Sequence, residues 1–171
     1  MHPDLNGSSE HLKEQTNPHS LTPEEEKRME EFCAQAFDFA RNNDVESLKI
    51  MLDHGLSVNF SNHKGDTLLM LASYHNSLEV ADLLLSYGAN VDQMNNKNQT
   101  PLAGVCFKGY DKMAEKLLKY GANPNAGSFT PINCAIMFQR KEILKLLMKH
   151  TDKKPSLLQR LYIKFFLRNK K

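Results

Sequence analysis

Apolar residues recur at helical spacing in two short runs within residues 65–92. The first run, residues 68–72, follows Thr67, whose hydroxyl can cap the N-terminus of a helix. The second run, residues 78–87, stops before Gly88, where a helix C-terminus favours a left-handed backbone. Two helices this short cannot bury both apolar faces by packing on each other alone. The pattern therefore predicts neighbouring units of the same kind.

The same pattern returns along the chain at a regular spacing. Thr100 follows Thr67 at an interval of 100 − 67 = 33, whereas Thr130 follows at 130 − 100 = 30, so one connecting loop is three residues shorter. The glycines that close the second helices keep the longer interval: Gly55, Gly88 and Gly121. Equal spacing of helix starts and stops predicts stacked helix–turn–helix units.

This unit resembles the ankyrin repeat. The resemblance is carried by Thr100-Pro101-Leu102, by Thr130-Pro131-Ile132, and by the corner strings HGLSVN, YGANVD and YGANPN. It implies an all-α solenoid within residues 21–152, with units at about 36–61, 62–94, 95–126 and 127–152. The family's usual histidine after T-P-L is replaced by Met70, Ala103 and Asn133, so we do not expect the hydrogen bonds that this histidine makes between units.

Both ends of the stack are expected to carry helical caps. Residues 22–26, Thr-Pro-Glu-Glu-Glu, are typical of a helix start, and we expect that helix to run into the first unit and cover its open end. Residues 153–171 predict a basic amphipathic helix whose aromatic face packs on the last unit. Residues 1–20 are polar and are predicted to be disordered.

Charge is distributed unevenly along the chain. Residues 153–171 hold seven basic residues and no acidic one, so the remainder carries 15 − 20 = −5 against a total of +2. A basic amphipathic helix can also attach to an anionic membrane, which is the alternative to a cap. Nucleic-acid binding is not expected.

Composition and motifs limit the chemistry. The three cysteines include no close pair, and the chain shows no secretory signal, no apolar run of membrane-span length and no paired metal-ligand spacing. We therefore expect a cytoplasmic protein without disulfides, metal or cofactor. There is no G-x-S-x-G, P-loop or H-E-x-x-H motif, and we expect no enzyme.

The resemblance implies a monomeric module that binds another protein. A second hypothesis is an accessory protein for a haem enzyme such as catalase, because small bacterial ankyrin proteins that accompany catalases are similar in size. No haem-attachment motif is present, so a Tyr, His or Cys side chain would have to supply the axial ligand. The third hypothesis is the membrane tether already described.

Candidate binding residues follow from their position in each unit. The pairs that lie seven and eight residues after each threonine are Tyr74-His75, Phe107-Lys108 and Met137-Phe138 (74 − 67, 107 − 100 and 137 − 130 all equal 7). Phe129 lies beside them at the short loop, and the projecting loops, here called the fingers, add His63, Lys64, Asn96 and Lys97. An exposed aromatic strip is typical of an interface. The alternative is that Phe107, Phe129 and Phe138 fold inward.

Overall fold

The computed structural model describes residues 22–151 and 154–168, which form helices and no extended strand. The predicted disordered tail, residues 1–20, lies outside the described residues. In chain order the helices are α1 (Pro23–Asn42), α2 (Val45–Asp53), α3 (Leu68–His75), α4 (Leu78–Ser86), α5 (Pro101–Lys108), α6 (Asp111–Lys119), α7 (Pro131–Met137), α8 (Lys141–Lys149) and α9 (Leu157–Arg168).

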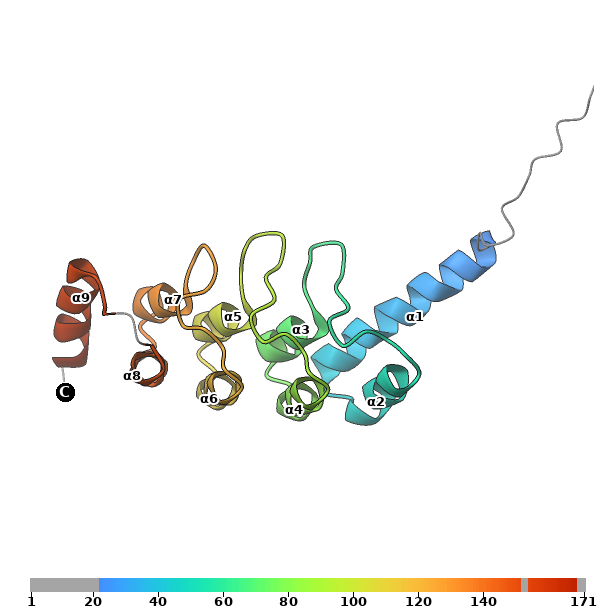
Figure 1. Cartoon of the computed structure of the whole chain (residues 1–171), viewed down its shortest axis with the longest axis horizontal. Coiled ribbons are helices and arrows are strands. Elements are labelled where there is room, and N and C mark those ends of the chain that lie inside the picture. The colour runs from blue at the N-terminus through green and yellow to red at the C-terminus, as the bar shows by residue number, and fades with distance from the viewer. Residues whose placement is uncertain (1–21, 152–153, 169–171) are drawn as a thin grey trace, which may run out of the picture.

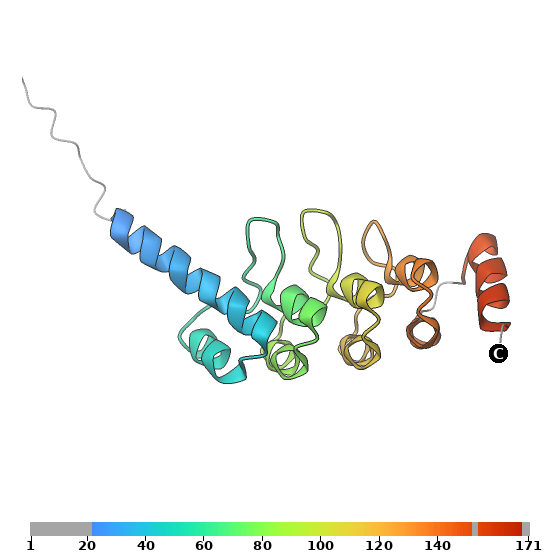
Figure 2. The same cartoon turned by 180° about the vertical axis from the view of Figure 1, so that it is seen from behind.

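The helices are arranged as a stack of antiparallel pairs in two layers (Figures 1 and 2). The inner layer contains α3, α5 and α7, and the outer layer contains α2, α4, α6 and α8. The fingers project beyond the inner layer, on the side away from the outer helices. This is the all-α solenoid that the regular spacing of the threonines and glycines predicts.

The predicted helix starts and stops are confirmed. The hydroxyls of Thr67, Thr100 and Thr130 accept hydrogen bonds of 3.1, 3.2 and 3.2 Å from the backbone N–H three residues later. Pro101 and Pro131 occupy the first helical position, where a backbone donor is not needed. The corner glycines have left-handed φ values of +99°, +83° and +85° at Gly55, Gly88 and Gly121.

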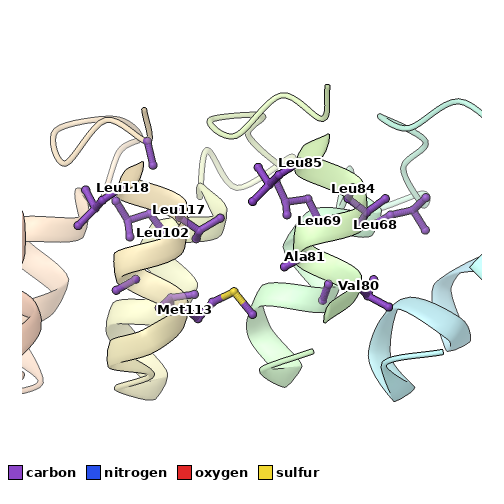
Figure 3. Packing of buried hydrophobic residues seen from close by; sticks show 14 of the residues in the cluster. Leu68, Leu69, Val80, Ala81, Leu84, Leu85, Leu102, Met113, Leu117 and Leu118 are labelled. Carbon is purple, nitrogen blue, oxygen red and sulfur yellow. The ribbon is translucent and has the colours of Figure 1, made fainter. Parts of the chain in front are cut away.

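Leucines at equivalent positions fill the space between successive units (Figure 3). Leu69 and Leu102 come from inner helices, Leu84 and Leu117 from outer helices, and all four are fully buried. Ile50 in the outer helix α2 is also apolar but is 59% exposed, because it lies on the side of α2 that points away from the stack. Burial therefore follows the helical face and not apolar character alone.

Turn residues supply polar contacts between units. The backbone N–H of Asn90 donates to Asn59 Oδ1 at 2.8 Å. The backbone N–H of Asn123, which holds the position of Asn90 in the next unit, donates to Asp92 Oδ1 at 3.0 Å. These bonds recur with the repeat, so each corner is tied to the next. They connect units in which Met70 and Ala103 replace the family's histidine.

Helix α1 belongs to the stack through its C-terminal half only. Thr22 caps it with Glu25 in a reciprocal capping box, as its sequence predicts. Ala36 and Ala40 are buried, whereas Met29 and Phe32 are exposed on the half that projects beyond the stack (Figure 1). A continuous helix keeps the direction set by its packed half. The cap expected at this end is therefore limited to the C-terminal half of α1.

Helix α9 contacts the last unit along a narrow side. Gln159 Nε2 donates to Asn133 Oδ1 at 2.9 Å, and Ile163 packs half-buried against the core. Leu158 and Phe165 remain exposed, so the expected packing of an aromatic face on the last unit does not hold for Phe165. The reason is register, since Gln159 and Ile163 lie on a different side of the helix from Phe165.

Candidate functional site

One groove of about 880 Å³ runs between the fingers and the inner helices. It is lined by residues from α3, α5 and α7 and from the fingers. Ten of the eleven predicted site residues line it: His63, Lys64, Tyr74, His75, Asn96, Lys97, Phe107, Phe129, Met137 and Phe138. The eleventh, Lys108, lies at its edge, with Nζ 4.7 Å from the centroid of the Tyr74 ring. Their role in binding stays a prediction.

Three aromatic rings form a row along the groove. Tyr74 and Phe107 are nearly parallel, with centroids 6.4 Å apart and an interplanar angle of 6°. Phe107 and Phe138 meet edge to face at 4.7 Å and 89°. Phe107 is 41% exposed and Phe138 36%, so these two rings do not fold inward, whereas Phe129 is half-buried against the core. The rings support one another and still present apolar surface to solvent.

The floor of the groove comes from residues one helical turn nearer each threonine. Leu71, Gly104 and Cys134 all lie four residues after their threonine (71 − 67, 104 − 100 and 134 − 130 equal 4). At Gly104 an added Cβ would come within 3.4 Å of the Tyr74 ring, so glycine leaves the floor open beside that ring. The prediction from the sequence considered only the residues seven and eight positions after each threonine and therefore missed this row. The residues four positions after each threonine can be found by the same count.

Arg41 is the equivalent of Tyr74 in the first unit, because 74 − 33 = 41. It lines the groove and pairs with Asp38, with Nη1 2.7 Å from Oδ1. Sequence reasoning missed it because Ala34 occupies the place of the threonine in that unit (67 − 33 = 34). Without that mark there was no residue from which to count.

Hydrogen bonds hold the first two fingers together. The backbone N–H of Asn96 donates to the Lys64 carbonyl at 3.0 Å, and the Asn96 side chain donates to the His63 carbonyl at 3.1 Å. The Asn95 side chain donates to Asp66 Oδ1 at 2.8 Å. The amide group of Asn96, a predicted contact residue, is therefore already used to fix the finger.

The same turn shapes both fingers. In the first, Asn62 Oδ1 accepts from the backbone N–H groups of Lys64 and Asp66. In the second, Asn95 Oδ1 accepts from those of Lys97 and Gln99, which hold the equivalent positions one unit later. Asparagine suits such turns because its side chain can bond to the backbone two residues on. The fingers thus present their exposed lysines from a fixed frame.

Positive charge predominates in the groove. The cationic side chains that line it are Arg41, Lys64 and Lys97, with Lys108 at the edge. Among the described residues that line it, Asp66 is the one carboxylate, and its oxygens accept bonds from the Asn95 and Asn62 side chains. This local surplus contrasts with the acidic balance of residues 1–152.

The pKa of His75 is affected by this surplus, although desolvation of the ring is the larger cause. Burial, followed by the charges of Arg41 and Lys108, lowers the pKa of its imidazole below the usual value of 6.5. The neutral form of His75 is therefore favoured in the free protein.

The buried thiols are unsuited to nucleophilic chemistry. Burial raises the pKa of Cys134 to about 11, and burial followed by the neighbouring Cys134 raises that of Cys106 further. A protonated thiol is neither a good nucleophile nor a metal ligand. Cys134 instead donates to the Ala103 carbonyl at 3.3 Å, which links two units.

Two other classes of site are missing from the part of the chain that the structure describes. No three His, Cys, Asp or Glu side chains there are placed to hold a metal ion. None of its helices has both the length and the apolar character needed to span a bilayer.

The part of the chain that forms the stack is also the part that is similar to known proteins. A family model described as ankyrin repeats (3 copies) matches residues 23–95 and 88–157, which is 157 − 23 + 1 = 135 of the 171 residues. A protein of Pseudomonas aeruginosa that is named as an ankyrin repeat protein is 50% identical over 56 residues. That match covers 33% of this chain and 33% of the relative, so it spans about a third of the relative's length.

Proposed function

This chain belongs to the ankyrin-repeat family, and on that premise we propose that it binds a partner protein in the groove between its fingers and inner helices. Ankyrin repeats are protein-interaction modules and, as a family, are not enzymes. The observation that carries the proposal is the row of exposed rings, Tyr74, Phe107 and Phe138, along a groove that also holds a surplus of basic residues.

The partner segment is acidic and carries aromatic or aliphatic side chains. Lys64 and Lys97 stand on adjacent fingers, and the Nζ of Lys108 lies over the Tyr74 ring. Asp66 offsets only part of this charge, because it is one carboxylate against the cations Arg41, Lys64 and Lys97 that also line the groove. Complementary charge aligns the segment along the groove and suppresses basic competitors.

Binding energy comes mainly from the rings. Interface hot spots are enriched in aromatic residues near the centre of a contact, and Phe107 lies between Tyr74 and Phe138. The hydrogen bonds between fingers reduce the entropy that would otherwise be lost in ordering them on binding. The chain acts as a rigid receptor for a segment that adapts to it.

The test is selection of binding peptides from a random library with the full chain, followed by fluorescence anisotropy on one selected peptide. The selected peptides should be rich in Asp, Glu and aromatic residues. Phe107→Ala should weaken binding by about 30-fold or more, the equivalent of about 2 kcal/mol. Lys119→Ala, on the exposed side of the outer layer, serves as the control and should bind normally.

Circular dichroism must first show that Phe107→Ala is folded. A folded Phe107→Ala and Tyr74→Ala double variant with wild-type affinity would overturn the proposal. Replacing Lys64 and Lys97 by glutamine should mainly slow association and reduce its salt dependence, because both lysines are exposed and act over a distance.

The haem-accessory hypothesis makes a different prediction for the same groove. His63, Tyr74 and His75 line it, and each side chain can in principle ligate haem iron. A saturable absorbance change on titration with haem, lost in Tyr74→Phe or His75→Gln, would favour that role. If haem causes no such change while acidic peptides bind, the groove is a peptide receptor.

A further inference from the structure

Helix α9 lies across the end of the stack, beyond α7 and α8 (Figures 1 and 2). Gln159 and Ile163, which are one helical turn apart, contact the last unit. These two residues lie on one side of α9, and the opposite side of the helix is exposed.

Four apolar side chains occupy the open part of that circumference. Leu157, Leu161 and Phe165 recur every four residues and are 74%, 59% and 71% exposed, and Leu158 beside them is 79% exposed. At about 3.6 residues per turn they cover roughly 100° of arc. A contiguous apolar face of this kind indicates an interaction surface, whereas an ordinary surface helix exposes apolar residues singly.

Basic residues border this face. Arg160 and Lys164 are exposed and lie along one side of it, and Lys154 precedes the helix. No acidic residue occurs anywhere in residues 153–171. The outer helix of the last unit adds Lys149 on an exposed position, whereas Lys145 on the same helix pairs with Glu142 at 2.8 Å.

We propose that α9 is an interfacial anchor whose exposed apolar face lies on the surface of an anionic phospholipid bilayer. Such helices combine an apolar face that enters the headgroup boundary with Lys and Arg that attract anionic lipids. The lysine stems reach along the apolar face while their ammonium groups stay among the headgroups. This role is independent of the groove, which belongs to different helices.

The position of α9 suits a flat surface. No other described element extends beyond it at that end of the stack (Figures 1 and 2). A bilayer can therefore approach α9 from the end, while the groove remains open to its own partner. A nucleic acid would use the basic residues but would not need four exposed apolar side chains.

The first experiment is co-sedimentation of the full chain with vesicles of phosphatidylcholine alone and with vesicles that also contain phosphatidylserine. Binding should require phosphatidylserine and should weaken as salt is raised. Leu161→Gln should weaken binding by about tenfold or more, because the apolar contact is lost at unchanged charge. Ile50→Gln is the matched control, since Ile50 is also 59% exposed, and it should bind as wild type.

A second experiment reports insertion directly. The chain contains no tryptophan, so Leu158→Trp places a single fluorescent reporter on the proposed face. Its emission should shift to shorter wavelength with phosphatidylserine vesicles, whereas that of Ile50→Trp should not. Absence of the shift, equal binding by Leu161→Gln, or failure of the wild-type chain to sediment with anionic vesicles would each overturn the proposal.

Discussion

The ring of Tyr74 lies almost parallel to that of Phe107, which occupies the same position one unit later in the chain. Phe107 meets Phe138, from the following unit, at a shorter centroid distance and nearly at right angles. The geometry of the row changes at Phe138, because Phe138 follows its threonine by eight residues and Phe107 follows its own by seven (138 − 130 = 8, 107 − 100 = 7). The repeat therefore places aromatic side chains in one row, and the position of each ring within its unit sets how closely neighbouring rings meet.

The ring contacts should be measurable as coupling energies. In double-mutant cycles to alanine, the Phe107–Phe138 pair should contribute about 0.5–1.5 kcal/mol to the free energy of unfolding. The Tyr74–Phe107 pair should contribute less, because its centroids are 6.4 Å apart against 4.7 Å. Urea unfolding of the four proteins in each cycle gives both values. The reverse order would contradict the geometry.

Truncation of the inter-unit leucines should destabilise the stack strongly. Leu84→Ala and Leu117→Ala should each lower the free energy of unfolding by about 2–5 kcal/mol, because both side chains are fully buried. Ile50→Ala, on an exposed helical position, should change it by less than about 0.5 kcal/mol. If all three substitutions had similarly small effects, the side of the outer helices that faces the core would have been assigned wrongly.

Two equivalent residues of the first two fingers should differ in how much stability is lost when each is replaced by alanine. Gly65 and Asn98 occupy the same position in successive units (98 − 65 = 33), and both have left-handed φ, at +75° and +54°. A Cβ at Gly65 would lie 2.7 Å from Asn96 Oδ1 and 2.9 Å from Asn96 N, and Asn96 is the residue whose backbone N–H and Nδ2 join the fingers. Gly65→Ala should therefore destabilise the protein more than Asn98→Ala, which adds no atom.

The expected magnitudes for this pair follow from backbone strain. Asn98→Ala should cost about 1 kcal/mol, since alanine tolerates left-handed φ less well than asparagine. Gly65→Ala should cost that amount plus the disruption of the Asn96 bonds. Thermal melts of both variants would test the order. Asn98→Gly is the control and should be nearly neutral.

Removal of α9 should leave the stack folded. Gln159 and Ile163 are its described contacts with the last unit, so deletion of residues 155–171 should lower the melting temperature by only a few degrees. The loss should be smaller than that caused by Leu117→Ala. Aggregation of the truncated chain, measured by light scattering, would instead show that α9 is needed as a cover. Vesicle binding should disappear in either case.

Much of the fold could be predicted because it repeats. Thr67, Thr100 and Thr130 fixed the helix starts, and the period then aligned positions that are far apart in sequence. The arrangement of the two terminal helices could not be predicted in this way. Each meets a single neighbouring unit, so no repetition constrains the direction of α1 or the face that α9 turns to the stack.

The residues of the candidate site could be predicted where a threonine marks the start of the unit. Positions marked by a threonine led to Tyr74 and Phe107, whereas Arg41 stands in a unit without that mark. The hydrogen bond that the Asn96 amide makes to the neighbouring finger could not be predicted from the sequence either, because it depends on the distance between two loops. Periodicity thus gave positions along the groove, and the structure gave the contacts that decide which side chains remain available.

His75 should make stability and binding respond to pH in opposite ways. Its pKa is lowered mainly by burial and further by Arg41 and Lys108, so folding favours the neutral imidazole. The stability that this supplies is present above the unfolded-state pKa of about 6.5 and is lost as pH falls toward the lower folded-state value. Between about pH 7 and 5, the wild type should therefore lose more stability than His75→Gln.

An acidic segment in the groove would reverse this shift, because its carboxylates favour the imidazolium. Binding should then take up a proton at His75 and tighten as pH falls, an effect that His75→Gln should remove. Proton NMR titration of the His75 ring, with and without a selected peptide, measures both states. Arg41→Gln should raise the free-state pKa only in part, since burial is the larger cause. A free-state pKa at or above 6.5 would contradict the first step, and a peptide that lowers it would contradict the second.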